Sequence, residues 1–354
     1  MRHMNEDAFW AVVSAVSPSF AARRQGGRAD EARDVREAIA YADSNGLYFP
    51  FVSRLVEDGI EIPREESRRW PAERERLARF RRSLRVLDAA SSRTGSAYAV
   101  IKTIRTIPNL PRDVDILVRE EDRRRWLDAL GQAGFALRYR SAAEVSLEMR
   151  DAIRVDVYSR IEYLGRAFLD PAYLWGSIRA ERTHAEEHPG LTDEAEFLLN
   201  SCHDIFGHGS LTLMDFLDLI ALRQRVDVSR CLDLATAAGW GHVLRLWLDR
   251  LDRLERLIRD ERGPPRFPLR HGRRFLWECV EALADPPQGR RERLAIGLSF
   301  LWDDASDLSE ESGLGGAMRR SPQVRRLVNV AGHRLRTLRG DRKAAMPSFR
   351  DEGG

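Results

Sequence analysis

The sequence of 354 residues is poor in cysteine and contains no long apolar run. Its three cysteines, Cys202, Cys231 and Cys279, are too far apart for a zinc cluster, and their odd number does not suit a disulfide framework. No stretch of about 18 apolar residues is present, so we expect no membrane span. The first residues, MRHMNEDAFW, lack the basic and then apolar layout of a signal peptide. We therefore expect a cytoplasmic protein with reduced cysteines.

Lysine is also scarce, since Lys102 and Lys343 are the only two among 58 basic residues. The net charge of +3 is too small to indicate nucleic-acid binding by itself, and the arginines are mostly interleaved with acids, as on solvated helix faces. Lys102 stands at the end of a predicted buried strand, shortly before a pair of aspartates. A compact ammonium group in that place suits a phosphate. The other interpretation is a strand-end lysine that reaches solvent.

The periodicity of apolar residues divides the chain into regions and predicts an α+β fold. Residues 1–94 show the spacing of helices, and residues 95–160 predict a small mixed β-sheet backed by helices. Residues 161–339 return to helical spacing, and the polar residues 340–354 predict a disordered tail. The fold class is therefore a small mixed sheet flanked by N-terminal and C-terminal helical regions.

Two of the predicted strands carry carboxylates. Asp113 and Asp115 are two residues apart in the strand 112–118, so they point to the same face. Asp156 lies on the polar face of the strand 153–158, between valines that face the other way. Desolvating an unpaired acid is costly, so we expect the three carboxylates to meet at a hard cation such as Mg²⁺, which prefers oxygen ligands. The alternative is three strand-end acids paired with nearby arginines.

This pattern resembles the nucleotidyltransferases of the DNA polymerase β superfamily. The resemblance is carried by AVIK at 99–102, RDVDILV at 112–118, RVDVY at 154–158, LLNSCHDIFGHGS at 198–210 and LMDFLDLIAL at 213–222. It is closest to the uncharacterised bacterial and archaeal nucleotidyltransferases in which a lysine stands before the D-x-D strand. The resemblance is specific over 96–160 and looser over 35–225. It implies that 95–160 form the nucleotidyltransferase catalytic core, between the N-terminal helical region 1–94 and a C-terminal helical domain 161–339.

The resemblance also implies a reaction and the residues that perform it. A nucleoside monophosphate would pass from a nucleoside triphosphate to a hydroxyl acceptor, with release of pyrophosphate. Asp113 and Asp115 would ligate both of two Mg²⁺ ions, for which Mn²⁺ is an alternative. Asp156 would ligate the catalytic ion and help to deprotonate the attacking hydroxyl.

The chain departs from the superfamily at the phosphate-binding element. The superfamily commonly has a Gly-Ser pair at the start of a helix before the D-x-D strand, whereas this chain has Lys102-Thr103. The triphosphate, with ATP among the candidate nucleotides, would then be held by Lys102 and Thr103, together with Arg105 or Arg112.

His203 and His208 are spaced by five residues, which places them on different faces of a helix. Because helical two-histidine zinc sites use a spacing of three or four, we do not expect a shared zinc ion. Two interpretations remain: the histidines are buried or capping residues at a helix end, or they contact the nucleotide base or the acceptor.

The acceptor is expected to be a hydroxyl-bearing small molecule such as a metabolite, an antibiotic or a sugar, and nucleic acid is not favoured. One alternative is a degenerate nucleotidyltransferase fold that binds a nucleotide or a partner protein, but such a protein would not need an intact trio of acids. Another is an enzyme that modifies RNA or protein. An RNA-modifying enzyme predicts one continuous arginine surface that leads to the site.

Overall fold

The structure is a computed structural model that describes residues 6–21, 35–103, 105–140, 144–163, 166–179, 188–208, 210–259, 265, 267–271 and 273–283. All of these residues belong to one compact unit, Met1–Ala284. The C-terminal end of the predicted helical region 161–339 and the predicted tail 340–354 lie outside the described residues.

The N-terminal region is helical, as predicted. Its helices are α1 (Glu6–Val16), α2 (Pro18–Ala21), α3 (Val35–Ser44), α4 (Tyr48–Glu57) and α5 (Arg64–Thr94). The long helix α5 ends at Gly95, whose φ of 63° is left-handed. Glycine adopts this conformation without a steric penalty, so it closes the helix and redirects the chain into the first strand.

The sheet has seven strands in the order β3-β4-β5-β2-β1-β9-β8. The strands are β1 (Tyr98–Ile101), β2 (Asp113–Val118), β3 (Ala136–Arg140), β4 (Glu144–Glu148), β5 (Arg154–Tyr158), β8 (Ile178–Arg179) and β9 (Gly190–Leu191). Strand β2 pairs antiparallel with β1 and parallel with β5, so the sheet is mixed. The predicted α+β class is confirmed. The sheet is wider than predicted because β8 and β9, two residues each, are too short to show alternation in the sequence.

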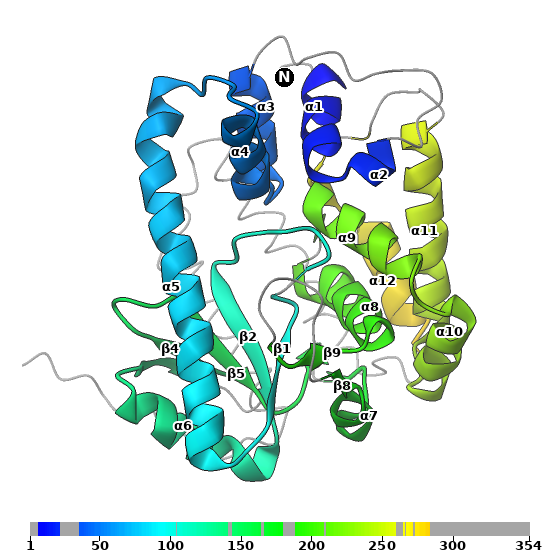
Figure 1. Ribbon diagram of the computed structural model, residues 1–354. Coiled ribbons are helices and arrows are strands. Elements are labelled where there is room, and N and C mark those ends of the chain that lie inside the picture. Colours follow the sequence, from blue (N-terminus) through cyan, green and yellow to red (C-terminus); the bar gives the residue numbers. More distant parts are fainter. Residues whose placement is uncertain are drawn as a thin grey trace, which may run out of the picture. The chain divides into compact units, whose positions relative to one another are not determined.

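One face of the sheet is covered by α5 and by α6 (Arg123–Gln132), which follows the short 3-10 helix η1 (Glu120–Asp122) (Figure 1). The apolar core on this face includes Leu84 and Leu87 of α5, Trp126 of α6, and alternate residues of β2 and β5. Val114 and Val155 are fully buried in this core. Because side chains alternate along a strand, the neighbours of these valines face the other side of the sheet.

The rest of the described chain is mainly helical. It contains α7 (Pro171–Gly176), α8 (Asp193–Cys202), the π-helical turn η2 (His203–His208), α9 (Leu213–Arg223), α10 (Val228–Ala237), α11 (Gly241–Arg259) and α12 (Arg273–Glu281). Two further antiparallel pairs are formed by β6 (Glu162–Tyr163) with β7 (Arg166–Ala167), and by β10 (Ser210–Leu211) with β11 (Leu269–Arg270), which follows α11. Among the described helices, none has both the length and the apolar character needed to cross a bilayer.

Candidate active site

The register of two central strands brings the predicted carboxylates together. In the parallel pair of β2 and β5, Asp115 lies opposite Asp156, and Asp113 lies opposite Arg154. These four residues alternate with the buried valines, so they share the face of the sheet that is turned away from α5 and α6. The exposed fraction of the side chain falls from 29% for Asp113 to 14% for Asp115 and 6% for Asp156.

Two cations hold these acids. The Nζ atom of Lys102 is 3.2 Å from Oδ2 of Asp115. The guanidinium of Arg154 spans the other two acids, with an ion pair to Asp113 and its Nε atom 3.2 Å from Oδ2 of Asp156. Three carboxylates and two cations thus share one half-buried face.

Burial and mutual repulsion act on the protonation of the acids. Burial is the main cause that raises the pKa of Asp115, and the charges of Asp113 and Asp156 raise it further, although Lys102 lowers it. Burial also raises the pKa of Asp156, against hydrogen bonding from Ser146 and the charge of Arg154. The pKa values of Asp115 and Asp156 are raised although two cations lie beside the acids, so a further cation would stabilise the ionised carboxylates.

The donor set fits a divalent cation of the kind that nucleotidyltransferases use. The Oδ1 atom of Asp156 is buried and has no hydrogen-bond partner, so one carboxylate oxygen is left to coordinate. Asp113 and Asp115 supply further carboxylate oxygens, the donor type that Mg²⁺ prefers. Among the described residues, no group of three or more His, Cys, Asp or Glu side chains has the arrangement of a metal site.

Lys102 and Thr103 turn the chain at the end of β1. Lys102 adopts a φ of 55°, a left-handed conformation that costs a lysine about 1–3 kcal/mol and is typical of functional sites. Its ammonium group lies 4.4 Å from the centre of the Tyr158 ring. The hydroxyl of Thr103 accepts a 2.8 Å hydrogen bond from the backbone N–H of Asp115. Lys102 and Thr103, two of the four residues predicted to hold the triphosphate, therefore contact the carboxylate strand directly.

Arg105 lies elsewhere, in a buried acidic cluster on α9. Its guanidinium is 2.7 Å from Oδ1 of Asp215 and 3.7 Å from Oδ2 of Asp218. Asp218 also accepts a 2.7 Å hydrogen bond from the backbone N–H of Thr106. The loop between β1 and β2 is thus fixed to α9, and the charge of Arg105 is already balanced there. Nearby Asp204, in η2, is fully buried, and burial raises its pKa well above the ordinary value.

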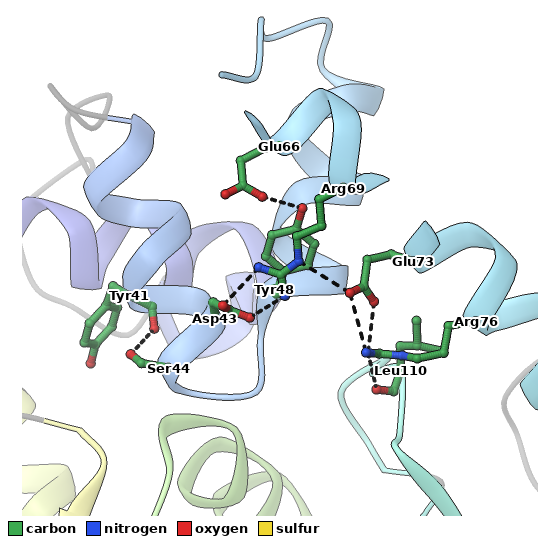
Figure 2. A network of polar contacts seen from close by, with 9 residues as sticks. All are labelled: Tyr41, Asp43, Ser44, Tyr48, Glu66, Arg69, Glu73, Arg76 and Leu110. Atoms are coloured by element: carbon green, nitrogen blue, oxygen red, sulfur yellow. Dashed lines mark hydrogen bonds and ion pairs between the residues drawn. The ribbon is translucent and has the colours of Figure 1, made fainter. Parts of the chain in front are cut away.

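The other end of the same loop is fixed to α5. Figure 2 shows a network in which Arg69 pairs with Asp43 and Glu73, and Arg76 pairs with Glu73. Arg76 also donates a 3.1 Å hydrogen bond to the carbonyl of Leu110, three residues before Asp113. The ion pairs that begin at α3, together with this hydrogen bond, therefore reach the loop just before β2.

Arg112 is exposed directly before β2. Its charge contributes, after that of Arg69, to lowering the pKa of Asp43 on α3. The side chain is therefore near the network of Figure 2, and the structure does not place it with the three carboxylates.

His203 pairs with a tyrosine that the sequence did not single out. The hydroxyl of Tyr163 lies 2.9 Å from Nδ1 of His203. A Cβ atom at Gly207 would stand 2.7 Å from the same Nδ1 atom and 3.2 Å from the tyrosine ring, so this close approach requires glycine. His208 ends the turn η2, and its side chain lies outside the described part. The segment is a π-helical turn, which is frequent at functional sites.

Sequence reasoning also missed Arg154. The signal was available, because Arg154 and Asp156 are two residues apart in RVDVY and so must share a face of the strand. The position of Arg154 opposite Asp113 depends on the register of two strands that are separated by β3, β4 and α6. No such signal exists for Tyr163, which lies in a two-residue strand.

Comparisons with known proteins agree with this fold and with the strand motifs. The family described as uncharacterised nucleotidyltransferases matches residues 110–254, which include β2, β5, α8 and α9. No protein with a curated description matches the chain.

Solved structures of two antibiotic-modifying enzymes are among those similar to the chain. The lincomycin-bound lincosamide antibiotic adenylyltransferase LnuA is 14% identical, with a TM-score of 0.29 over 38% of this chain and 91% of that protein. ANT(2″)-Ia in complex with adenylyl-2″-tobramycin is 11% identical, with a TM-score of 0.34 over 43% of this chain and 92% of that protein. A solution structure of ANT(2″)-Ia is 14% identical, with a TM-score of 0.34 over 48% and 94%.

The family match covers the strands that bear all three carboxylates and the helices that follow them. Over residues 110–254 the chain is similar to the uncharacterised nucleotidyltransferases, and this match supports an enzyme of the nucleotidyltransferase class.

Proposed function

We propose that this enzyme transfers a nucleoside monophosphate from a nucleoside triphosphate to a hydroxyl group of a small molecule and releases pyrophosphate. The observation that carries the proposal is the pairing of Asp115 with Asp156 across β2 and β5, with Asp113 on the same face. Lys102, held against Asp115, adds the cation that a triphosphate requires.

The chain's own groups can perform the transfer. The acceptor oxygen attacks the α-phosphorus in line, and the bond from this phosphorus to the bridging oxygen of the β-phosphate breaks. The hydroxyl proton passes to the carboxylate of Asp156, and pyrophosphate leaves. Asp113, Asp115 and Asp156 would hold divalent ions, which would lower the pKa of the hydroxyl and balance the charge of the leaving group.

The residues predicted to bind the nucleotide divide into three groups. Lys102 and Thr103 lie beside the carboxylates, and we assign them to the phosphates. Arg105 is engaged by Asp215, so we assign it to holding the loop rather than to binding the nucleotide. Arg112, His203 and His208 stay candidates for contacts with the nucleotide or the acceptor.

A small acceptor is favoured over RNA by the pairing of the described arginines. A continuous basic surface needs unpaired cations, which bind phosphates by releasing counterions. Many described arginines instead contact acids, including Arg54, Arg69, Arg79, Arg138, Arg154, Arg223 and Arg225. Within this proposal, residues 95–160 provide the catalytic core, and the helical regions 1–94 and 161–339 support it.

Nucleotide binding and turnover test the proposal in two steps. Thermal shifts are measured with ATP, CTP, GTP and UTP in the presence of Mg²⁺, for the wild type, Asp113→Ala and the control Asp128→Ala, which alters an exposed residue of α6. A nucleotide that binds the folded state raises its melting temperature by mass action. We expect a shift for the wild type and Asp128→Ala, and a much smaller one for Asp113→Ala. Pyrophosphate release with a panel of hydroxyl-bearing small molecules follows.

The possible results distinguish the proposed function from a nucleotide-binding protein and from an RNA-modifying enzyme. Release of pyrophosphate that requires both a small acceptor and Asp113 supports the proposal. Nucleotide binding without release for any acceptor overturns it in favour of a degenerate binding protein. Release with RNA alone overturns the assignment of a small acceptor.

A further inference from the structure

Arg154 lies on the same face of the sheet as the three carboxylates, and the proposed transfer reaction gives it no role. It stands opposite Asp113 in the register of β2 and β5, and two residues before Asp156 on the same strand. Its guanidinium pairs with Oδ2 of both acids. A planar guanidinium with several donors is well suited to span two carboxylates in this way.

The pairing is held by charge. The guanidinium keeps its positive charge in proteins, and it lies between the carboxylates of Asp113 and Asp156. Without it, Asp113 and Asp156 would join Asp115 as three acids balanced by Lys102 alone. Arg154 therefore neutralises the pair of acids at the outer side of the cluster.

The same oxygens cannot serve the guanidinium and a divalent ion at full strength. Both ligands need the lone pairs of the carboxylates, and two cations within a few ångströms of each other repel. Arg154 pairs with the Oδ2 atoms of Asp113 and Asp156, and Oδ1 of Asp156 is a buried oxygen without a hydrogen-bond partner. Coordination of a divalent ion through these two Oδ2 atoms thus requires that the guanidinium withdraw.

Arg154 can withdraw, whereas Lys102 cannot do so easily. The side chain of Arg154 is 37% exposed, so it can turn into solvent without leaving a cavity. The side chain of Lys102 is 5% exposed and packs on the Tyr158 ring. Once displaced, a guanidinium at the edge of the site is suited to bind phosphate oxygens in a bidentate manner.

We propose that Arg154 is a resident counter-cation that a divalent metal ion displaces, and that the displaced guanidinium binds the phosphates of the incoming nucleotide. The inference rests on the proposed function, because it takes the three acids as metal ligands. Its consequence is that metal and nucleotide bind cooperatively: each tightens the binding of the other by the same factor. Arg154 thus sets the affinity for the metal before the nucleotide binds.

Direct metal binding tests the inference without turnover. Mn²⁺ is titrated into the full chain, and the free ion is measured by its electron paramagnetic resonance signal. The variants are Arg154→Gln, Arg154→Lys and the control Arg138→Gln, which removes an exposed arginine of β3 that pairs with Glu148. Each titration is repeated with a triphosphate analogue whose α–β bridge is not cleavable.

We expect Arg154→Gln to bind Mn²⁺ roughly tenfold or more tightly than the wild type when no nucleotide is present, within the range by which outer residues change metal affinity. The same variant should bind the nucleotide analogue more weakly and lose most of the coupling. Arg154→Lys, which keeps the charge, should fall between it and the wild type, and Arg138→Gln should match the wild type. The gain in Mn²⁺ affinity should disappear when Asp156→Asn is combined with Arg154→Gln in one protein.

Equal or weaker Mn²⁺ binding by Arg154→Gln in the absence of nucleotide would overturn the inference, even if the enzyme turns over. A wild type that shows no transfer, but whose Arg154→Gln variant gains metal affinity through Asp156, would refute the proposed function and leave the inference standing. Coupling that is unchanged in Arg154→Gln would show that the guanidinium does not move to the phosphates.

Discussion

The substitution Asp156→Asn should remove activity while it stabilises the fold. Asp156 is 4% exposed, and its Oδ1 atom has no hydrogen-bond partner. Burial raises its pKa above the ordinary value of 3.8, so protonation favours folding. That stability is present below the ordinary pKa and is lost as the pH rises through the raised pKa. At neutral pH the ionised carboxylate therefore weakens the fold, and asparagine removes this effect.

The size of the expected gain in stability follows from the contacts of Asp156. Asparagine relieves a buried charge with an unsatisfied oxygen, worth about 1–3 kcal/mol. It weakens the ion pair with Arg154, which is partly exposed and so worth about 0–1 kcal/mol. The net gain is about 1 kcal/mol, or roughly 2–4 °C in melting temperature for a domain of this size. The transfer rate should fall by about 10²–10⁴-fold, because the base that accepts the proton is lost.

Urea unfolding at neutral pH and at about pH 4 measures the first effect, and pyrophosphate release measures the second. The gain in stability should shrink at the lower pH, where the wild-type carboxyl group becomes protonated. Asp128→Asn on the exposed side of α6 is the control and should change neither property. An Asp156→Asn enzyme that is less stable than the wild type at neutral pH, or that keeps its transfer rate, would refute the reasoning.

Three further substitutions probe the surroundings of the site. Asp218→Ala removes the acceptor of the 2.7 Å bond from Thr106 and breaks a buried ion pair, so urea unfolding should show a loss of about 3–5 kcal/mol. Gly207→Ala places a Cβ atom 2.7 Å from Nδ1 of His203, and the displaced ring should lower the free energy of unfolding by about 1–3 kcal/mol. The raised pKa of Asp204 means that its protonated form stabilises the fold and that this stability is lost as the pH rises through that pKa. Asp204→Asn should therefore flatten the decline of stability with rising pH in a series of urea titrations.

For each of these three predictions, one result would contradict the reasoning. An Asp218→Ala protein as stable as the wild type would mean that α9 does not hold the loop. If Gly207→Ala leaves the histidine resonances of an NMR spectrum in place, the close approach is absent in solution. Identical pH profiles for Asp204→Asn and the wild type would show that the carboxyl group of Asp204 does not titrate in the range tested.

The faces of the strands could be predicted from the sequence, whereas their register could not. Alternation in β2 and β5 assigned the valines to the core and the aspartates to the other face, because the period of two is strict. The register that sets Asp115 against Asp156 depends on long-range packing, which leaves no local signal. For the same reason, the sequence does not reveal that Asp215 and Asp218 of α9 pair with Arg105, which lies in the loop between β1 and β2.

The dependence of the site on β1 limits how small an active fragment of this enzyme can be. The segment matched by the family, 110–254, omits β1, although β1 lies between β2 and β9 in the sheet. It also omits Arg76, which holds the loop before β2 from α5. A truncated chain that begins at residue 110 would expose the edge of β2 and leave Asp115 without the ammonium group beside it. We therefore expect the smallest active fragment to begin no later than α5, upstream of the segment that the family model matches.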